Sequence, residues 1–177
     1  CDEKDTVMEL ELLALSNIEK AKENLQKVVI ESELQKSQRY SSLFNSSISL
    51  KREDLQKVRS FKIRGAFNKI SSLNKKEKLD GVVCSSAGNH AQGVAQSCNQ
   101  LQINGVIYMP MITPKQKVAQ VKMFGGPFIE VRLHGDTYDD SYEAALDYCI
   151  QSKKHFIHPF GRYYLLTCKI FPLTGEE

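Results

Sequence analysis

The stretch GVVCSSAGNHAQGVAQSCNQLQINGVIYMP, residues 81–110, decides which fold the sequence predicts. Two short apolar runs, residues 81–86 and 104–110, have the length and composition of buried strands. Between them the apolar residues recur at spacings of three and four, which predicts a helix over 90–101. A strand, a helix and a second strand in this order are typical of a parallel sheet, because parallel neighbours need a crossover connection.

The same alternation continues towards the C-terminus. Thr113 and Pro114 predict the N-cap and first turn of a helix that reaches Phe124 and ends at Gly125-Gly126. The elements that follow are a strand over 128–133, a helix with an acidic first turn over 136–151 and a strand over 155–160. Strands and helices therefore alternate from residue 81 to residue 160, which predicts an α/β fold with an open parallel sheet and flanking helices.

The N-terminal part of the sequence is less regular. Residues 7–28 predict one or two amphipathic helices, and residues 48–51 predict a short strand after a turn at Asn45. Ser60 is a favourable N-cap for a further helix. The apolar positions of that helix are Ile63, Ala66, Phe67, Ile70 and Leu73.

The composition of the chain argues against several classes of protein. The formal net charge is +3 over 177 residues and the basic residues are scattered, so we expect no nucleic-acid partner. No apolar run approaches membrane-spanning length, so we expect no membrane partner, and the acidic start CDEKD is unlike a secretory signal. The five cysteines form no C-x-x-C pair, which predicts free thiols in a reducing cytoplasm, with Cys98 and Cys149 in the core. His155 and His158 have no further ligands at zinc spacing, so we expect no metal.

The loop that leaves the first strand of the predicted sheet is a candidate binding site. Ligands of open parallel sheets bind at the carboxyl ends of the strands. The small residues of the segment 85–88 allow a ligand to approach the backbone, and the following helix points its N–H groups and positive dipole end into the same space. This arrangement suits a carboxylate or a phosphate. Asn89 and His90 add polar side chains, although Asn89 could equally serve only as the cap of the helix.

Lys62 is the second candidate. If Ser60 is the N-cap, Lys62 occupies the second helical position, where the helix dipole and the apolar neighbours Phe61 and Ile63 both lower the pKa of an amine. A lysine with a lowered pKa is a nucleophile suited to forming a Schiff base with a carbonyl group. The alternative is an ordinary solvated lysine on the exposed face of the helix.

Three motifs give the sequence a family resemblance over roughly residues 15–160. They are LKREDLQ with RSFKIRGA (50–56 and 59–66), SSAGNHAQGVA (85–95) and PMITPKQKVAQVKMFGG (110–126). Together they resemble the threonine dehydratases, or threonine ammonia-lyases, of isoleucine biosynthesis. These enzymes belong to the tryptophan-synthase-β-like class that depends on pyridoxal phosphate (PLP).

The resemblance implies a role for each residue of the two candidate segments. Lys62 matches the family lysine that holds PLP as a Schiff base, and Asn89 matches the asparagine that hydrogen-bonds the ring hydroxyl of the cofactor. Phe61 matches a residue packed near the cofactor. The residues that match the loop around the substrate carboxylate are Ser86, Ala87, Gly88 and His90.

The implied reaction is a β-elimination. Lys62 removes the α-proton of threonine, the β-hydroxyl leaves as water, and hydrolysis of the released enamine gives 2-oxobutanoate and ammonia. In the family this occurs in a cytoplasmic homo-oligomer. Serine dehydratase and serine racemase share the lysine and the asparagine loop, and the match over 110–126 favours threonine.

The sequence departs from the family at two places. The usual Thr-Pro-Leu is Ser32-Glu33-Leu34, and the stretch 161–177 does not follow the family pattern. We expect residues 1–65 to be the N-terminal segment of the larger PLP lobe, 66–160 the small α/β lobe and 161–177 a divergent tail. The family's glycine-rich phosphate cradle would follow this point, and Gly125-Gly126 ends a helix instead of beginning one. The alternative hypothesis is therefore a truncated, catalytically silent α/β module.

Overall fold

A four-stranded parallel sheet is the centre of the structure, a computed structural model that describes residues 15–159. The strands are β3 (Val82–Ser85), β4 (Gly105–Met109), β5 (Ile129–Leu133) and β6 (His155–Phe156). All three neighbouring pairs run parallel, which confirms the predicted alternation. Of the strand predicted over 155–160, His155 and Phe156 pair with β3, and residue 160 lies outside the described residues.

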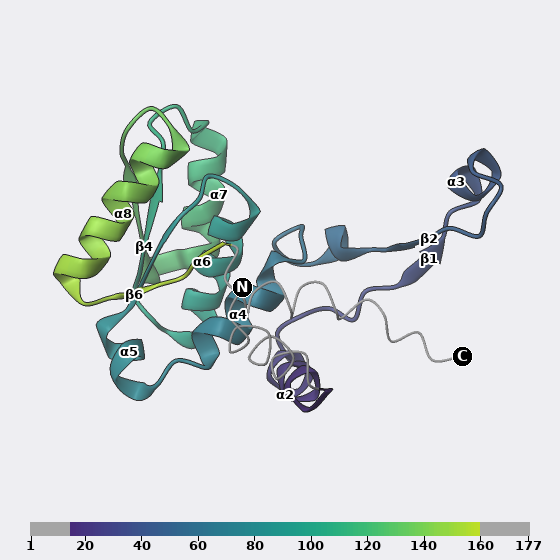
Figure 1. Ribbon diagram of the computed structural model, residues 1–177, viewed down its shortest axis with the longest axis horizontal. Helices are drawn as coiled ribbons and strands as arrows, with labels where there is room; N and C mark the ends of the chain where they lie inside the picture. Colours follow the sequence, from purple (N-terminus) through teal and green to yellow (C-terminus); the bar gives the residue numbers. More distant parts are fainter. Residues whose placement is uncertain (1–14, 160–177) are drawn as a thin grey trace, which may run out of the picture.

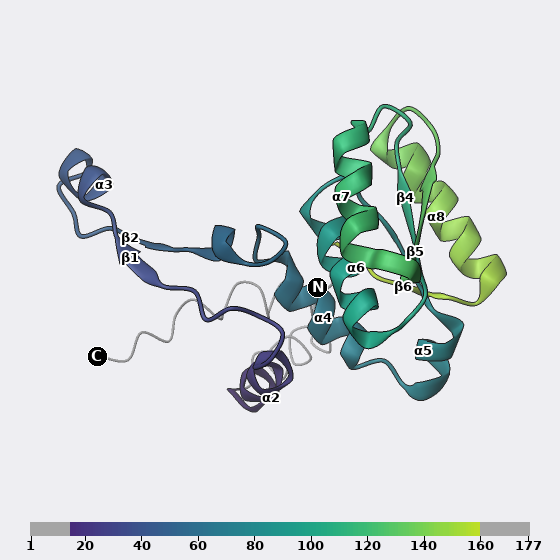
Figure 2. The same cartoon turned by 180° about the vertical axis from the view of Figure 1, so that it is seen from behind.

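Helices cover both faces of this sheet (Figures 1 and 2). Those of the α/β body are α4 (Lys62–Ser71), α5 (Lys75–Asp80), α6 (Asn89–Leu101), α7 (Lys115–Gly125) and α8 (Tyr138–Ser152). A short 3-10 turn, η2 (Gly126–Phe128), leads from α7 into β5. Residues of α4, α6 and α7 share one apolar cluster with the sheet, and α8 packs against the opposite face.

The alternation of side chains along β3 explains why both faces need cover. Val82 and Cys84 point into the cluster on the α4 and α6 side, whereas Val83 packs with Ala145 of α8. All four are fully buried. Burial of a valine-sized side chain stabilises the fold by about 1.5–3 kcal/mol, so a sheet apolar on both faces is stable only between two helical layers.

The order of the strands places a switch point beside β3. The order across the sheet is β5-β4-β3-β6, so the connection through α6 leaves β3 on one side and the connection through α8 returns to its other side. The loops after β3 and β6 therefore diverge at the carboxyl edge of the sheet. In open α/β sheets a crevice between such loops is the usual place for a ligand.

The N-terminal residues form a helix and an arm that extends away from the α/β body (Figures 1 and 2). The elements are α2 (Leu15–Leu25), β1 (Leu34–Lys36), α3 (Gln38–Leu43), β2 (Ser49–Lys51) and the 3-10 turn η1 (Glu53–Leu55). β1 and β2 pair antiparallel, so the strand predicted at 48–51 is confirmed. The helix predicted over 7–28 is confirmed from Leu15 to Leu25, and its first part lies outside the described residues.

One set of buried polar bonds holds the N-terminal segment together, and a second set joins it to α4. The Gln56 amide is buried and pairs with the main chain of Ile30, with an Nε2–O distance of 2.7 Å and an N–Oε1 distance of 2.9 Å. Arg64 of α4 donates two hydrogen bonds, of 2.8 and 2.7 Å, to the carboxylate of Glu53. Ser32, at the first position of the family's Thr-Pro-Leu, donates to the same carboxylate at 2.5 Å. These bonds fix the chain that leads into Lys62.

Two predicted helix caps are wrong. The N-cap of α4 is Phe61 and not Ser60, so Lys62 is the first helical residue and not the second. Phe61 already has helical dihedral angles (φ −65°, ψ −11°), so the chain enters the helix through a turn and not through an extended cap residue. The N-cap of α7 is Pro114 and not Thr113. The Ser60 and Thr113 hydroxyl oxygens are buried and have no hydrogen-bond partner among residues 15–159.

The helix ends and the thiols agree better with the predictions. Gly126, with φ +54°, is the C-cap of α7, as the glycine pair predicts. Cys98 is buried in the core, and burial raises the pKa of its thiol to about 12. Cys149 is partly buried, and its Sγ donates to the Lys154 carbonyl at 2.9 Å. Within residues 15–159 the cysteines are free.

Candidate active site

A cavity of about 480 Å³ lies at the switch point of the sheet. Four segments far apart in the sequence contribute to it: the start of α4, the loop from β3 into α6, the start of α8 and the chain that follows β6. Its lining residues are Lys62, Ser85, Ser86, Asn89, His90, Tyr138 and Pro159. The two candidate segments of the sequence therefore meet in one pocket.

Lys62 reaches this cavity from the first turn of α4. Its Nζ donates a hydrogen bond of 3.2 Å to the carbonyl of Pro159, which follows β6. The Nζ atom is 5.7 Å from the ring centroid of Phe61, whose side chain is 41% exposed and is not among the lining residues. The amine thus points along the wall of the pocket, at the positive end of a helix dipole. The prediction that Phe61 packs on the cofactor stays a prediction.

The two serines after β3 differ in the hydrogen bonds they can offer a ligand. Ser141 of α8 donates its hydroxyl proton to the Tyr138 carbonyl at 2.8 Å, so its 3.0 Å contact with the Ser85 oxygen needs Ser85 as the donor. Ser85 consequently presents only lone pairs to the cavity. The Ser86 oxygen accepts from the Gly88 N–H at 3.2 Å, a bond that leaves its proton for a carboxylate.

Asn89 is the first residue of α6, and its exposed side chain lines the cavity. The N-cap of α6 is Gly88, and no side chain caps the helix. The reading of Asn89 as a helix cap is therefore wrong. A Cβ on Gly88 would meet no atom within 4 Å, so open space lies beside the loop there, as expected where a ligand approaches the backbone. Ala87 and Gly88 are not among the lining residues.

His90 is tied to the end of the sheet. Its side chain is buried, and its Nε2 lies 3.0 Å from the carbonyl of Ile157. Burial lowers the pKa of the imidazole to about 4, with a smaller contribution from the charge of Lys62 in the same direction. A neutral imidazole must donate from Nε2 to reach a carbonyl oxygen, which fixes the tautomer. His90 thus holds the loop after β3 to the chain after β6, and its predicted contact with a substrate carboxylate stays a prediction.

Two of the lining residues were not predicted from the sequence. Tyr138 begins α8, and Pro159 follows the last strand. No local signal marks either of them, because their place depends on β6 returning to the far side of β3. The order of the strands is a property of the packed sheet and not of any one motif.

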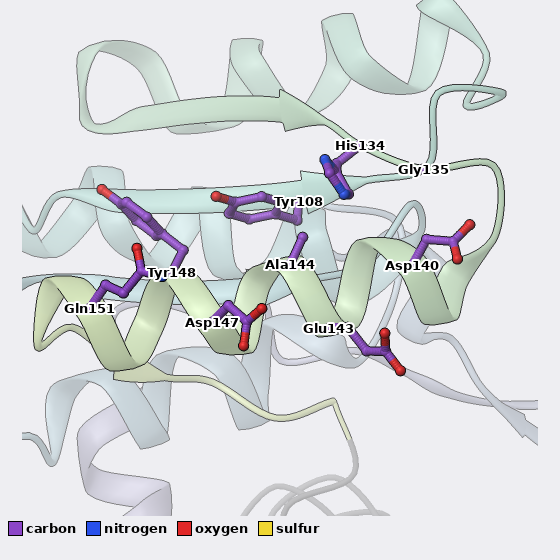
Figure 3. Close-up of a pocket in the computed structure, with 9 residues that line it drawn as sticks. All are labelled: Tyr108, His134, Gly135, Asp140, Glu143, Ala144, Asp147, Tyr148 and Gln151. Atoms are coloured by element: carbon purple, nitrogen blue, oxygen red, sulfur yellow. The ribbon is translucent and has the colours of Figure 1, made fainter.

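A second cavity, of about 550 Å³, lies on the α8 side of the sheet (Figure 3). Its walls are acidic: Asp140, Glu143 and Asp147 of α8 line it, with His134 and Tyr108 opposite. The Asp140 carboxylate accepts from the Asp136 and Thr137 main-chain N–H groups at 3.0 and 2.9 Å, so it serves as part of the cap of α8. Three carboxylates without a lining amine disfavour an anionic ligand. The switch-point cavity is therefore the better candidate for one.

The described residues hold neither a metal cluster nor a membrane span. Within 15–159 there is no group of three His, Cys, Asp or Glu side chains that could hold a metal ion. In the same part of the chain, no helix has both the length and the apolarity needed to cross a membrane.

Fold and site together define a doubly wound α/β protein with a lysine amine and the N-terminus of a helix in one pocket. The chain belongs to the pyridoxal-phosphate dependent enzyme family, which matches residues 25–170. This confirms the resemblance and the fold class drawn from the motifs. The family match ends at residue 170, within the stretch 161–177 that was expected to be a divergent tail. This stretch lies outside the described residues.

Individual members of the family show which proteins this chain is similar to. The chain is 57% identical over 142 residues to the biosynthetic L-threonine dehydratase IlvA of Halalkalibacterium halodurans, a match covering 80% of this chain and 34% of the relative. It superposes on the processed threonine deaminase isoform 2 of Solanum lycopersicum with a TM-score of 0.77 and 34% identity, over 87% of this chain and 43% of the other. Maize serine racemase gives a TM-score of 0.79 and 27% identity, over 86% and 46% of the two chains. The chain thus spans about a third of the length of the curated relative.

Proposed function

We propose that this chain carries the lysine half of a pyridoxal-phosphate dependent site that deaminates L-threonine to 2-oxobutanoate and ammonia. One observation carries the proposal: Lys62, Ser86 and Asn89 line one cavity at the switch point of the sheet. The relatives named threonine dehydratase and threonine deaminase support threonine as the substrate. Isoleucine biosynthesis and a cytoplasmic homo-oligomer follow from the same resemblance.

The residues of the cavity fit one end of the cofactor. The Lys62 amine lies beside the start of α6, whose first-turn N–H groups favour an anion, and the Asn89 amide can bond a ring hydroxyl. The phosphate end has no comparable match among residues 15–159. Gly125 and Gly126 end α7, where the helix dipole disfavours a phosphate.

The chain's own residues then have distinct tasks in the reaction. When bound, PLP would supply an electron sink for the electrons left at the substrate α-carbon. Lys62 takes the α-proton at its Nζ, and the Pro159 carbonyl holds that atom at the wall of the cavity. Ser86 and the first turn of α6 bind the substrate carboxylate, which fixes the α-carbon before Lys62. His90 holds the two loops together through its Nε2 contact with the Ile157 carbonyl.

A second candidate function is supported by the surface of the arm. Large apolar side chains are exposed there, namely Leu34, Leu43, Phe44, Leu50 and Leu55. Exposed apolar patches mark surfaces that other polypeptide covers. This favours the hypothesis that the described residues alone are a catalytically silent module. A serine dehydratase-like or racemase-like activity is the alternative within the family, and the likeness to maize serine racemase supports it.

A titration of the purified chain with PLP separates these functions. We expect an absorption band in the visible region and, after borohydride reduction and peptide mapping, an adduct on Lys62. That result would justify assays with threonine and with serine, and the ratio of their kcat/KM values would identify the substrate. A silent module would instead give no band, or a label spread over several surface lysines.

Replacing Asn89 with alanine should weaken the binding of PLP and leave the fold intact. The side chain is exposed and makes no cap, so its loss removes only a hydrogen bond to the ligand. We expect the PLP concentration for half-maximal labelling of Lys62 to rise about tenfold. The matched control is Asn74→Ala, which removes the capping box of α5 and should cost about 1 kcal/mol of stability without changing PLP labelling. A loss of folding in Asn89→Ala would contradict the ligand role.

A further inference from the structure

One close contact links the two halves of the candidate site. Gly93 lies in α6, four residues after Asn89, and therefore on the same face of the helix. A Cβ built on Gly93 would lie 2.9 Å from the carbonyl oxygen of Lys62, 3.1 Å from its carbonyl carbon and 3.3 Å from the nitrogen of Ile63. The main chain of Lys62 thus rests directly on Gly93.

The atoms in this contact explain why only glycine fits there. All three neighbours are main-chain atoms at the start of α4, which cannot rotate away as the end of a side chain can. Ordinary contact begins at 3.4 Å, so a methyl group at Gly93 would displace the Lys62 main chain by about 0.5 Å. Gly93 is buried in the interface between α4 and α6, so the displacement has no path into solvent.

We propose that Gly93 is a positioning residue, which sets the separation of α4 from α6 and so places the Lys62 amine relative to Asn89. The proposal rests on the function proposed above for Lys62. Glycine in a helix interior lowers stability by about 0.5–1 kcal/mol relative to alanine, so helix propensity does not explain a glycine at this position. Here the absent methyl group permits the contact, and the contact aligns two groups that must act on one ligand.

The test compares Gly93→Ala with Gly105→Ala. A Cβ built on Gly105 would meet neighbours at similar distances, with Ile129 Cδ1 at 2.8 Å and Cys98 Sγ at 3.0 Å. Gly105 is the first residue of β4, so it lies at the amino ends of the strands, whereas the cavity lies at their carboxyl ends. Two readouts are taken on each folded variant. The first is the PLP concentration for half-maximal borohydride-trapped labelling of Lys62. The second, without PLP, is the rate at which acetic anhydride acetylates Lys62 relative to Lys69 in the same helix.

We expect Gly93→Ala to raise the half-maximal PLP concentration about tenfold and to raise the relative acetylation of Lys62 about threefold, through loss of its bond to Pro159. Gly105→Ala should change neither. Equal behaviour of the two variants would overturn the positioning role while leaving that of Lys62 intact. If the wild-type chain forms no Lys62 adduct, the proposed function fails, and the acetylation ratio alone decides the role of Gly93.

A second variant covers the case in which Gly93→Ala does not fold. Ser97 donates from Oγ to the Gly93 carbonyl at 2.7 Å, a bond of the kind that bends helices locally. Ser97→Ala shifts the Gly93 main chain without adding an atom to the contact. A change of about twofold in the same direction in both readouts supports the proposal, and unchanged values contradict it.

Discussion

We expect that replacing Lys62 with alanine abolishes the borohydride-trapped adduct with PLP. Among the lining residues of the cavity, Lys62 supplies the amine that can form a Schiff base with a carbonyl carbon. Lys62 is partly exposed and donates a hydrogen bond to Pro159, so the variant should fold as the wild type does. The measurement is the visible absorption band together with the mass of the reduced peptide that contains position 62.

The matched control is Lys69→Ala in the same helix. Lys69 lies in the last turn of α4, seven positions away from Lys62, and does not line the cavity. Its removal should leave the band and the labelled peptide unchanged. A band of full strength in Lys62→Ala would show that another lysine holds the cofactor, and the peptide map would identify it.

The second large effect concerns the fold. Arg64→Ala should lower the free energy of unfolding by about 3 kcal/mol, measured by urea denaturation. The Arg64 and Glu53 side chains are 6% and 15% exposed, and the variant leaves the carboxylate of Glu53 in this position without its cation. The bond between them joins the arm to α4, so its loss should also expose the turn before Lys62 to proteolysis.

An exposed ion pair one residue away provides the control. Arg52 and Asp54 lie 2.8 Å apart, with side chains 33% and 58% exposed. Solvent and salt weaken such pairs, so Arg52→Ala should lose several times less stability than Arg64→Ala. Equal losses in the free energy of unfolding would contradict the expectation that burial makes the Arg64–Glu53 pair more important for stability.

The same ion pair predicts a pH dependence. Burial alone would raise the pKa of Glu53, but the hydrogen bonds from Arg64 and Ser32 outweigh it and lower that pKa below the ordinary value of 4.5. A carboxyl group with a lowered folded-state pKa contributes stability above its ordinary pKa, and that contribution is lost as the pH falls through the lowered value. The stability difference between wild type and Arg64→Ala should therefore be full at neutral pH and shrink below pH 4.5.

The two segments that meet in the cavity were both candidates from the sequence. Small residues after a buried strand, followed by a helix, predict an anion site wherever they occur, because helix N–H groups and the strand edge create it locally. Lys62 was singled out by the motif resemblance, because its place at a helix start fits an ordinary solvated lysine as well as a reactive amine. What local chemistry could not predict is the exact cap, because Ser60 and Thr113 satisfy the cap rule in sequence while the tertiary turn places Phe61 and Pro114 there.

The sequence by itself determined the alternation of strands and helices, the family and the two segments that carry the site. These depend on the periods of apolar residues and on motifs of neighbouring residues, which need no knowledge of distant contacts. Only the tertiary structure decided that β6 lies beside β3, that Pro159 and Tyr138 therefore close the cavity, and that Lys62 rests on Gly93. Those contacts join residues far apart in the chain, and the packing of two helical layers on one sheet selects them.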